Sequence, residues 1–406
     1  MTNRDDLALS QEMSLIAYTS RTLYTPVESV DRPVVVVEDG AIVKLGTRGS
    51  VEVPPHAEMH DFGDGILAPG LVDLHIHGSA VYDVMQAEKT ARRGFEQFLA
   101  RHGVTSYYPT TIAAPLDVIE GALERLADAI EEAARGNPGD NSPGDGRAQP
   151  LGVHLEGPFL SHARCGAHRP EDLVSPSVEV FDKFWQAARG HIRLMTIAPE
   201  LEGALEVIAE AAKRGVCVSL GHSDADLEST RRGVAAGARH STHTFNAMRP
   251  LRHRDPGIVG EVLTNPHLTA DIIADGLHVD PTVVKLFLNA KGTENAVLIT
   301  DATSATGMPD GKYQLGPLQV EVKDGKVLRD GKLAGSVLTM DRAVRNAMKF
   351  AGWDLQRAVR IASANPARVA GAQNKGMLKP GADADFVVLS PNGEVRATVI
   401  AGKLVA

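Results

Sequence analysis

LVDLHIHGSA (residues 71–80) joins a run of apolar, strand-forming residues to two histidines and then to a glycine. Alternate side chains of a strand project from the same face, so His75 and His77 would point to one place. Taken alone, the pair is either a metal clamp or a coincidence, because a short motif stays a hypothesis until its context is known. The rest of the sequence has to decide between the two interpretations.

The composition is that of a soluble globular protein, with 43% hydrophobic and 23% charged residues among 406. A net charge of −9, no basic run and 4% aromatic residues argue against a nucleic-acid partner. No apolar stretch reaches the roughly 18 residues that cross a bilayer, and the polar start lacks a signal-peptide core. Two cysteines fit a reducing compartment without a disulfide framework. We therefore expect a cytoplasmic protein with no membrane partner.

Strand-like and helix-like runs alternate through the middle of the chain. Helical spacing of apolar residues is found at 116–135 and 202–214. The predicted strands are 71–77, 104–110, 151–157, 192–199, 216–223, 240–246, 268–278 and 296–303. Eight strands are the number that closes a parallel βα barrel. The sequence therefore predicts an α/β fold with a (β/α)8 TIM-like barrel over residues 69–375.

Both ends of the chain carry short β-type runs broken by Gly, Pro and Asp, with no convincing helix. We predict that residues 1–68 and 376–406 pair into one small β-sandwich domain. The Pro/Gly/Asp-rich stretch RGNPGDNSPGDGRAQ (residues 135–149) indicates a flexible surface loop and not a domain linker.

Histidines and carboxylates fall toward the carboxyl ends of six of the eight predicted strands. In chain order they are His75 and His77, Glu156, His222, His243, His278 and Asp301. The carboxyl ends of the strands form the face on which barrel enzymes build their active sites. Each residue alone could be an ordinary capping or buried side chain, but a shared position is hard to obtain by accident. The metal-clamp interpretation of the opening pair is therefore favoured.

The set of side chains indicates the metal and its chemistry. Imidazoles and carboxylates without a thiolate suit Zn²⁺ or Fe²⁺, with Mn²⁺ or Co²⁺ as substitutes. Four histidines (75, 77, 222 and 243) with Glu156 and Asp301 exceed the needs of one catalytic ion and suffice for two bridged ions. Such a site lowers the pKa of bound water toward ~7 and polarises a carbonyl. The sequence therefore predicts a metal-dependent hydrolase.

Longer motifs carry a family resemblance. PGLVDLHIHG and ITDAT resemble the amidohydrolase superfamily. Across about residues 60–400 the chain resembles the N-acetylglucosamine-6-phosphate deacetylase family of that superfamily, on five motifs: HLEGPF (154–159), GHSDA (221–225), THTFNAM (242–248), IADGLHVD (273–280) and LAGSVLTM (333–340). Many amidohydrolases bridge two metals with a carboxylated lysine on strand four. The fourth predicted strand, IRLMTIAPE, has no lysine, and the resemblance gives that role to Glu156.

The resemblance also implies roles for the other ligands. Glu156, His222 and His243 match the metal site that every member of the family keeps, and the retained His75 and His77 imply a second ion. Asp301 matches the catalytic aspartate, which takes a proton from metal-activated hydroxide and passes it to the leaving nitrogen. His278 stabilises the developing oxyanion or holds the amide. The products would be glucosamine 6-phosphate and acetate, as in amino-sugar catabolism and cell-wall recycling.

The substrate contacts come from the resemblance alone, because the chain has no Gly-rich phosphate loop. His168, Asn246 and Ala247 match residues that hold the substrate. Arg254 matches an arginine that reaches in from a neighbouring subunit, which implies a homodimer or a dimer of dimers. An arginine fork suits phosphate geometry, although a solvated loop arginine is the plain alternative. The loop that lines the sugar is matched by Leu333, Ala334 and Gly335.

Two other functions fit parts of the sequence. An amidohydrolase acting on another N-acyl sugar or a cyclic amide would keep the metal ligands but not the phosphate contacts. A barrel that has lost its metals could serve as a binding protein, but such a chain should have lost ligands, and all six are present. Metal analysis separates the last possibility from the two enzymes.

Overall fold

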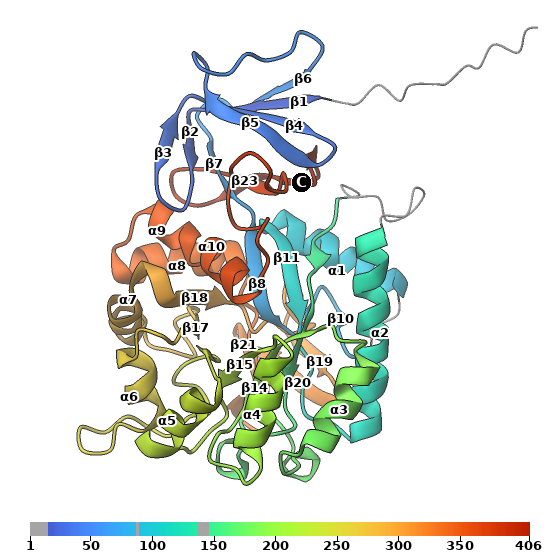
Figure 1. Ribbon diagram of the computed structural model, residues 1–406, viewed down its shortest axis with the longest axis vertical. Coiled ribbons are helices and arrows are strands. Elements are labelled where there is room, and N and C mark those ends of the chain that lie inside the picture. The colour runs from blue at the N-terminus through green and yellow to red at the C-terminus, as the bar shows by residue number, and fades with distance from the viewer. Residues whose placement is uncertain (1–14, 87–88, 136–145) are drawn as a thin grey trace, which may run out of the picture.

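The structure is a computed structural model that describes residues 15–86, 89–135 and 146–406. A β-rich part contains strands from both ends of the chain, and a larger α/β part carries helices around parallel strands (Figure 1). The predicted loop at residues 135–149 falls mostly outside the described residues, as does the polar start of the chain. None of the helices in the described ranges is long and apolar enough to cross a membrane.

Parallel strands that follow one another in chain order form the inside of the α/β part. They are β8 (Leu71–Ile76), β11 (Val104–Pro109), β12 (Gln149–Pro150), β13 (Val153–Glu156), β14 (Ile192–Ile197), β15 (Cys217–Leu220), β16 (His240–Ser241), β17 (Ala270–Ile273) and β18 (Ala296–Ile299). They pair in three groups, β12-β11-β8, β13-β14-β15-β16 and β17-β18. A parallel bridge from Thr110 to His154 joins the first group to the second, and one from Ile76 to Ala302 joins β18 back to β8.

All eight predicted strands are confirmed, and each is shorter than its predicted run. The residues lost from the ends are mainly those just after a strand. His243, for example, lies beyond β16 and not within it, and His278 lies in the loop after β17. The apolar pattern marks where a strand passes through the core, but the polar residues that follow it belong to loops. Those loops carry most of the candidate site, and His75 and Glu156 lie in strands.

Helices cover the outside of the parallel strands (Figure 1). The predicted helix at residues 116–135 is α2 (Leu116–Arg135), which buries Ile119, Leu123, Leu126 and Ile130 at spacings of three and four residues. The predicted helix at 202–214 is α4 (Ala204–Lys213). The others are α1 (Lys89–Arg101), α3 (Val178–Ala187), α5 (Leu227–Ala236), α6 (Gly257–Thr264), α7 (Pro281–Asn295), α8 (Met340–Ala351), α9 (Leu355–Arg360), α10 (Ala364–Val369) and the 3-10 turns at His162–Arg164 and Pro170–Asp172.

The β-rich part consists of two sheets that share one core. One sheet has the order β25-β24-β23-β7-β2-β3 and the other β5-β4-β1-β6. Tyr18 from the second sheet packs with Leu67 and Phe386 from the first in the same apolar cluster. The strands are β1 (Ile16–Thr19), β2 (Thr22–Tyr24), β3 (Ser29–Asp31), β4 (Pro33–Glu38), β5 (Ala41–Thr47), β6 (Glu58–Asp61), β7 (Ile66–Pro69), β23 (Phe386–Leu389), β24 (Val395–Ile400) and β25 (Lys403–Leu404).

A further antiparallel sheet, between β18 and α8, was not predicted from the sequence. It consists of β19 (Gly311–Leu315), β20 (Leu318–Lys323), β21 (Lys326–Arg329) and β22 (Lys332–Leu333), in that order. The signal was present, since buried and exposed residues alternate along β20 and Asp-Gly pairs at 324–325 and 330–331 mark hairpin turns. A small hairpin of β9 (Gly78–Ser79) and β10 (Tyr82–Asp83) follows β8.

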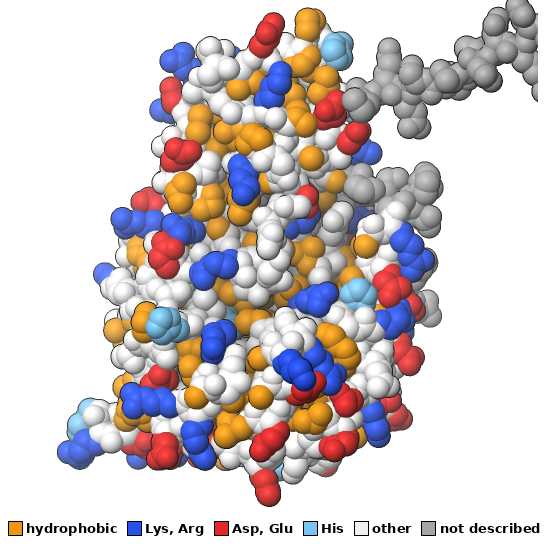
Figure 2. All heavy atoms as spheres, in the orientation of Figure 1, with side chains coloured by type: hydrophobic (Ala, Val, Ile, Leu, Met, Phe, Trp, Pro, Cys, Tyr) orange, Lys and Arg blue, Asp and Glu red, His pale blue; other side chains and the backbone are white. Residues whose placement is uncertain are grey.

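Acidic and basic side chains are interspersed over the face of the molecule that Figure 2 shows, and no continuous basic area is visible there.

Candidate metal centre

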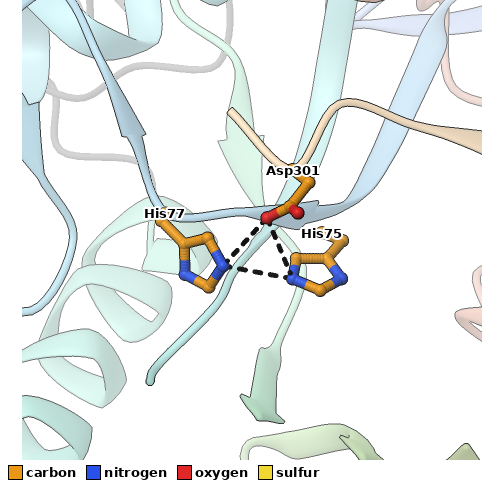
Figure 3. A group of neighbouring side chains, drawn as sticks. All are labelled: His75, His77 and Asp301. Atoms are coloured by element: carbon orange, nitrogen blue, oxygen red, sulfur yellow. Dashed lines mark hydrogen bonds and ion pairs between the residues drawn. The ribbon is translucent and has the colours of Figure 1, made fainter. Parts of the chain in front are cut away.

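The opening histidine pair meets an aspartate that follows β18, the last of the parallel strands. His75 lies in β8, His77 comes directly after it, and Asp301 lies two residues beyond β18 (Figure 3). The two Nε2 atoms are 3.2 Å apart. Asp301 Oδ1 lies 3.5 Å from Nε2 of His75 and 3.1 Å from Nε2 of His77. These three residues form the first cluster, one of two groups among the described residues that could hold a metal ion.

The second cluster consists of Glu156, His222 and His243. Oε1 of Glu156 lies 3.2 Å from Nε2 of His222 and 3.0 Å from Nε2 of His243. The two imidazole nitrogens are 3.0 Å apart. All three side chains are buried. Glu156 ends β13, and His222 and His243 lie two residues beyond β15 and β16.

The Glu156 carboxylate connects the two clusters. Its Oε1 faces His222 and His243, whereas its Oε2 lies 3.4 Å from Nε2 of both His75 and His77. A carboxylate that offers one oxygen to each of two groups has the geometry of a bridge between two cations.

The protonation pattern of the histidines fits a cation between them. Nδ1 of His77 lies 3.0 Å from the carbonyl oxygen of Thr110, and Nδ1 of His222 lies 2.9 Å from that of Arg164. A carbonyl can only accept, so each Nδ1 donates the proton and Nε2 of the neutral ring keeps its lone pair. Both lone pairs then face carboxylate oxygens, an arrangement that requires either a second proton or a metal ion.

The spacing of the ligand atoms also fits. Zinc binds nitrogen and oxygen at about 2.0–2.1 Å, so two ligands of a tetrahedral ion lie about 3.3 Å apart. The ligand atoms are separated by 3.1 to 3.5 Å in the first cluster and by 3.0 to 3.2 Å in the second.

The electrostatics of the site favour positive charge at its centre. Burial disfavours the charged forms of His77 and His243, but the adjacent carboxylates outweigh it and raise their pKa values to about 10 and about 9. Burial likewise opposes ionisation of Glu156 and Asp301, but the surrounding histidines, His75 foremost, hold the pKa of both carboxyls well below the usual range. Two buried carboxylates therefore stay ionised and attract protons or metal ions.

A repeated backbone feature aims three of the ligands. His222, His243 and Asp301 each lie two residues beyond the end of a strand and have left-handed φ values of 48°, 28° and 50°. This conformation costs a non-glycine residue about 1–3 kcal/mol and is concentrated at functional sites. Here it turns the chain sharply at the strand end, which brings each side chain over the ends of the parallel strands.

An open cavity of about 620 Å³ lies over the two clusters. The predicted site residues that line it are His77, Glu156, His168, His222, His243, Asn246, Ala247, His278, Asp301, Leu333, Ala334 and Gly335. His75 is fully buried and does not reach the cavity. The structure thus brings together every predicted site residue except one.

The exception is Arg254, which is exposed and does not line the cavity of its own chain. It lies in the loop before α6, which projects from the α/β part in Figure 1.

Sequence reasoning missed the residues that orient the ligands. Asp275 Oδ2 lies 2.7 Å from Nδ1 of His278, so Nε2 of that histidine is left toward the cavity. Asp73 accepts hydrogen bonds from the backbone N–H groups of His75 and of Thr300, which directly precedes Asp301. Asp271 accepts one from the backbone N–H of His243. Asp73 lies two residues before His75, and Asp275 lies three residues before His278, so the local sequence could have indicated both. Asp271 and His243 are 28 residues apart, so no local pattern connects them.

Comparison with known proteins gives the same direction. A family model described as "Amidohydrolase family" matches residues 66–405. The N-acetylglucosamine-6-phosphate deacetylase of Lysinibacillus sphaericus is 38% identical over 354 residues, which are 86% of this chain and 88% of that protein. The N-acetylgalactosamine-6-phosphate deacetylase of Escherichia coli is 39% identical over 341 residues, covering 84% and 87% of the two chains.

A solved structure is similarly close. A variant of N-acetyl-D-glucosamine-6-phosphate deacetylase from Mycobacterium smegmatis, in complex with N-acetyl-D-glucosamine-6-phosphate, superposes with a TM-score of 0.88 and 33% identity. The match covers 97% of this chain and 100% of that one.

The chain belongs to the amidohydrolase family, a group of metal-dependent hydrolases with a mixed α/β fold. Within that family, the relatives named above are deacetylases of 6-phosphorylated N-acetylhexosamines.

Proposed function

We propose that this chain hydrolyses the N-acetyl group of N-acetyl-D-glucosamine 6-phosphate, giving D-glucosamine 6-phosphate and acetate. The observation that carries the proposal is the Glu156 carboxylate between two ligand clusters, at the floor of a cavity that also holds Asn246, Ala247 and His278. The names of the relatives support the same substrate.

The ligand set suits two divalent ions, held by His75, His77 and Asp301 on one side of Glu156 and by His222 and His243 on the other. Zn²⁺ fits the nitrogen and oxygen donors best, and Fe²⁺, Mn²⁺ or Co²⁺ are possible in its place. When bound, such ions lower the pKa of water and polarise a carbonyl oxygen.

Asp301 is proposed as the proton carrier. The charges and hydrogen bonds of His75 and His77 outweigh burial and hold its pKa below the usual range, so the carboxyl group is ionised and has an oxygen open to the proton of the attacking water. It then returns the proton to the amide nitrogen as the C–N bond breaks. His278, fixed through Nδ1 by Asp275, presents Nε2 to the acyl oxygen or the amide.

The phosphate and sugar are assigned to the other predicted residues. Asn246 and Ala247 follow the ligand His243 and line the cavity next to it. His168 accepts a hydrogen bond at Nδ1 from Ala113, so its Nε2–H is free to donate to the substrate. The part of the cavity assigned to the sugar is lined by Leu333, Ala334 and Gly335.

Arg254 is proposed to reach the phosphate of a partner subunit, so that the active unit is a homodimer or a dimer of dimers. Its exposure on a projecting loop supports this assignment. Arg254→Ala should raise KM for the phosphorylated sugar roughly ten- to a hundredfold, the value of one charge-assisted contact, and should leave the unphosphorylated sugar unaffected. Equal effects on KM for both sugars would contradict the assignment of Arg254 to the phosphate site.

For the architecture, we propose that the strands β8, β11 and β13 to β18 close into a (β/α)8 barrel over residues 69–375, and that residues 1–68 and 376–406 form one β-sandwich domain. The two bridges between the strand groups and the mixed core of the terminal sheets support this division. The two unpaired cysteines, Cys165 and Cys217, support a cytoplasmic location.

Release of acetate from N-acetylglucosamine 6-phosphate tests the function directly, with the unphosphorylated sugar as control. N-acetylgalactosamine 6-phosphate belongs in the same assay, because the N-acetylgalactosamine-6-phosphate deacetylase of Escherichia coli is 39% identical to this chain. A kcat/KM higher for the galacto sugar would change the assigned substrate to that epimer. No hydrolysis of either phosphorylated sugar would refute the proposal.

A further inference from the structure

An apolar wall borders the cavity beside the ligand clusters. It is formed by Ile112, Leu315 and Leu318, each only 3% exposed, and all three line the cavity. We call these three residues the leucine wall, after its two leucines. Neither the metal site nor the phosphate contacts use them.

Two of the three residues come from the tip of one hairpin. Leu315 ends β19 and Leu318 begins β20, and the two are directly paired across the Gly316–Pro317 turn. Side chains that face each other in an antiparallel pair project from the same side of the sheet. Both leucines therefore enter the cavity together.

The hairpin tip is held rigidly at its glycine. The N–H of Gly316 donates to Oδ2 of the buried Asp83 at 2.7 Å, and its carbonyl oxygen accepts from Nε2 of Gln86. A Cβ on Gly316 would lie 2.8 Å from the Ile112 side chain, so the tip rests on the third member of the wall without a gap. These contacts oppose withdrawal of the wall from a larger group.

The leucine wall adjoins the reacting centre. Ile112 is two residues after Thr110, whose carbonyl holds His77, and directly before Ala113, whose N–H donates to His168 at 3.1 Å. Nε2 of His168 lies 3.8 Å from Oε2 of Glu156. Ile112 thus lies in the chain between residues that contact His77 and His168, and it lines the cavity, whereas Asn246 and Ala247 enter from the loop after β16.

We propose that the leucine wall receives the methyl group of the substrate's acetyl group and sets the length of acyl chain that the enzyme accepts. This inference rests on the proposed deacetylase function. Sugar hydroxyls and phosphate lose hydrogen bonds to water when they are placed against buried leucines, but a methyl group is favoured there. The acetyl methyl is the one apolar group of the substrate that must lie next to the reacting carbonyl.

The test compares N-acetyl- and N-propionyl-glucosamine 6-phosphate, with formation of the common product, glucosamine 6-phosphate, as the readout. One extra methylene against a tight apolar wall should lower kcat/KM of the unmodified enzyme by about 10- to 200-fold. Leu318→Ala and Ile112→Ala should each raise the propionyl-to-acetyl ratio of kcat/KM by about tenfold or more, and Ile112→Val should give an intermediate ratio. The ratio is taken within one preparation, so a loss of folded protein cancels.

Leu333→Ala is the matched control, because Leu333 lines the same cavity on the proposed sugar side. It should change kcat/KM for both substrates alike and leave the ratio unchanged. The inference is overturned if the unmodified enzyme uses both acyl groups equally, if neither wall variant moves the ratio, or if Leu333→Ala moves it as far. Those results would not contradict the proposed deacetylase function. That function is refuted separately if the unmodified enzyme has no activity on the acetyl substrate.

Discussion

The residues of the first ligand cluster lie at the ends of two neighbouring strands, whereas those of the second lie at or just beyond the ends of three strands. His75 and His77 lie on and just after β8, and the Asp301 N–H donates to the His75 carbonyl across the adjoining strand end. In the second cluster, His243 and Glu156 are 87 residues apart in the chain, and β14 separates the strand of Glu156 from that of His222. The first cluster is mostly a local motif and the second is a product of the whole sheet.

The two clusters also differ in access. Glu156, His222 and His243 all line the cavity, but the first cluster reaches it only through His77 and Asp301, because His75 is completely buried. An ion in the second cluster would therefore have all three of its ligands at the cavity, whereas an ion in the first would have two. Four changes test how far the clusters act separately.

Glu156→Gln should have the largest effect, because both clusters share this carboxylate. The amide keeps the size of the side chain but removes the negative charge that faces four imidazoles. We expect the content of both ions to fall and activity to drop to background. Elemental analysis after dialysis without chelator measures the metal content, and product formation measures the activity. Loss of a single equivalent would show that the carboxylate serves one cluster only.

Asp301→Asn should lower kcat by roughly 10²–10⁴, the usual contribution of a general acid–base group. Asp301 belongs to the first cluster, so metal content must be determined alongside the rate. Full occupancy with a low kcat would assign its main effect to proton transfer. Near-normal turnover with full occupancy would contradict the proposed proton carrier.

The double variants His75→Ala/His77→Ala and His222→Ala/His243→Ala compare the clusters directly. Each should lose about one of two equivalents of metal, because each removes the imidazoles of one cluster. The first pair should keep measurable activity and the second should not, since the second cluster has the better access to the cavity. Equal activities in the two variants would mean that access does not distinguish the clusters.

A change of pH removes no ligand, so with metal in excess it should affect activity least, and its effect should appear in metal affinity. In the metal-free chain the pKa is about 10 for His77 and about 9 for His243, above the ordinary value near 6.5. At pH 7.5 both rings carry a proton that the metal must displace. Apparent affinity should therefore rise with pH, by about tenfold per unit for each proton displaced, and level off above those pKa values. An indicator dye that follows proton release when Zn²⁺ is added to apoenzyme measures the number of protons displaced at each pH.

Several features could be predicted because their signal is local. The strand of His75 and His77 is a short apolar run, and the helix at 116–135 has its apolar residues at helical spacing. The antiparallel sheet from Gly311 to Leu333 was missed although alternation and Asp-Gly turns were present. Its strands are exposed on one face, so they resemble loop sequence when apolar runs are the main guide.

The sequence by itself determined which side chains could bind metal and where along the chain they occur, because imidazole and carboxylate chemistry and strand periodicity are properties of the residues. Only the tertiary structure decided that Glu156 places one oxygen on each cluster, and that Leu315 and Leu318 line the same cavity as the ligands. These contacts join segments that are distant in the chain or depend on left-handed turns at strand ends, and their energies exist only once the strands have packed side by side.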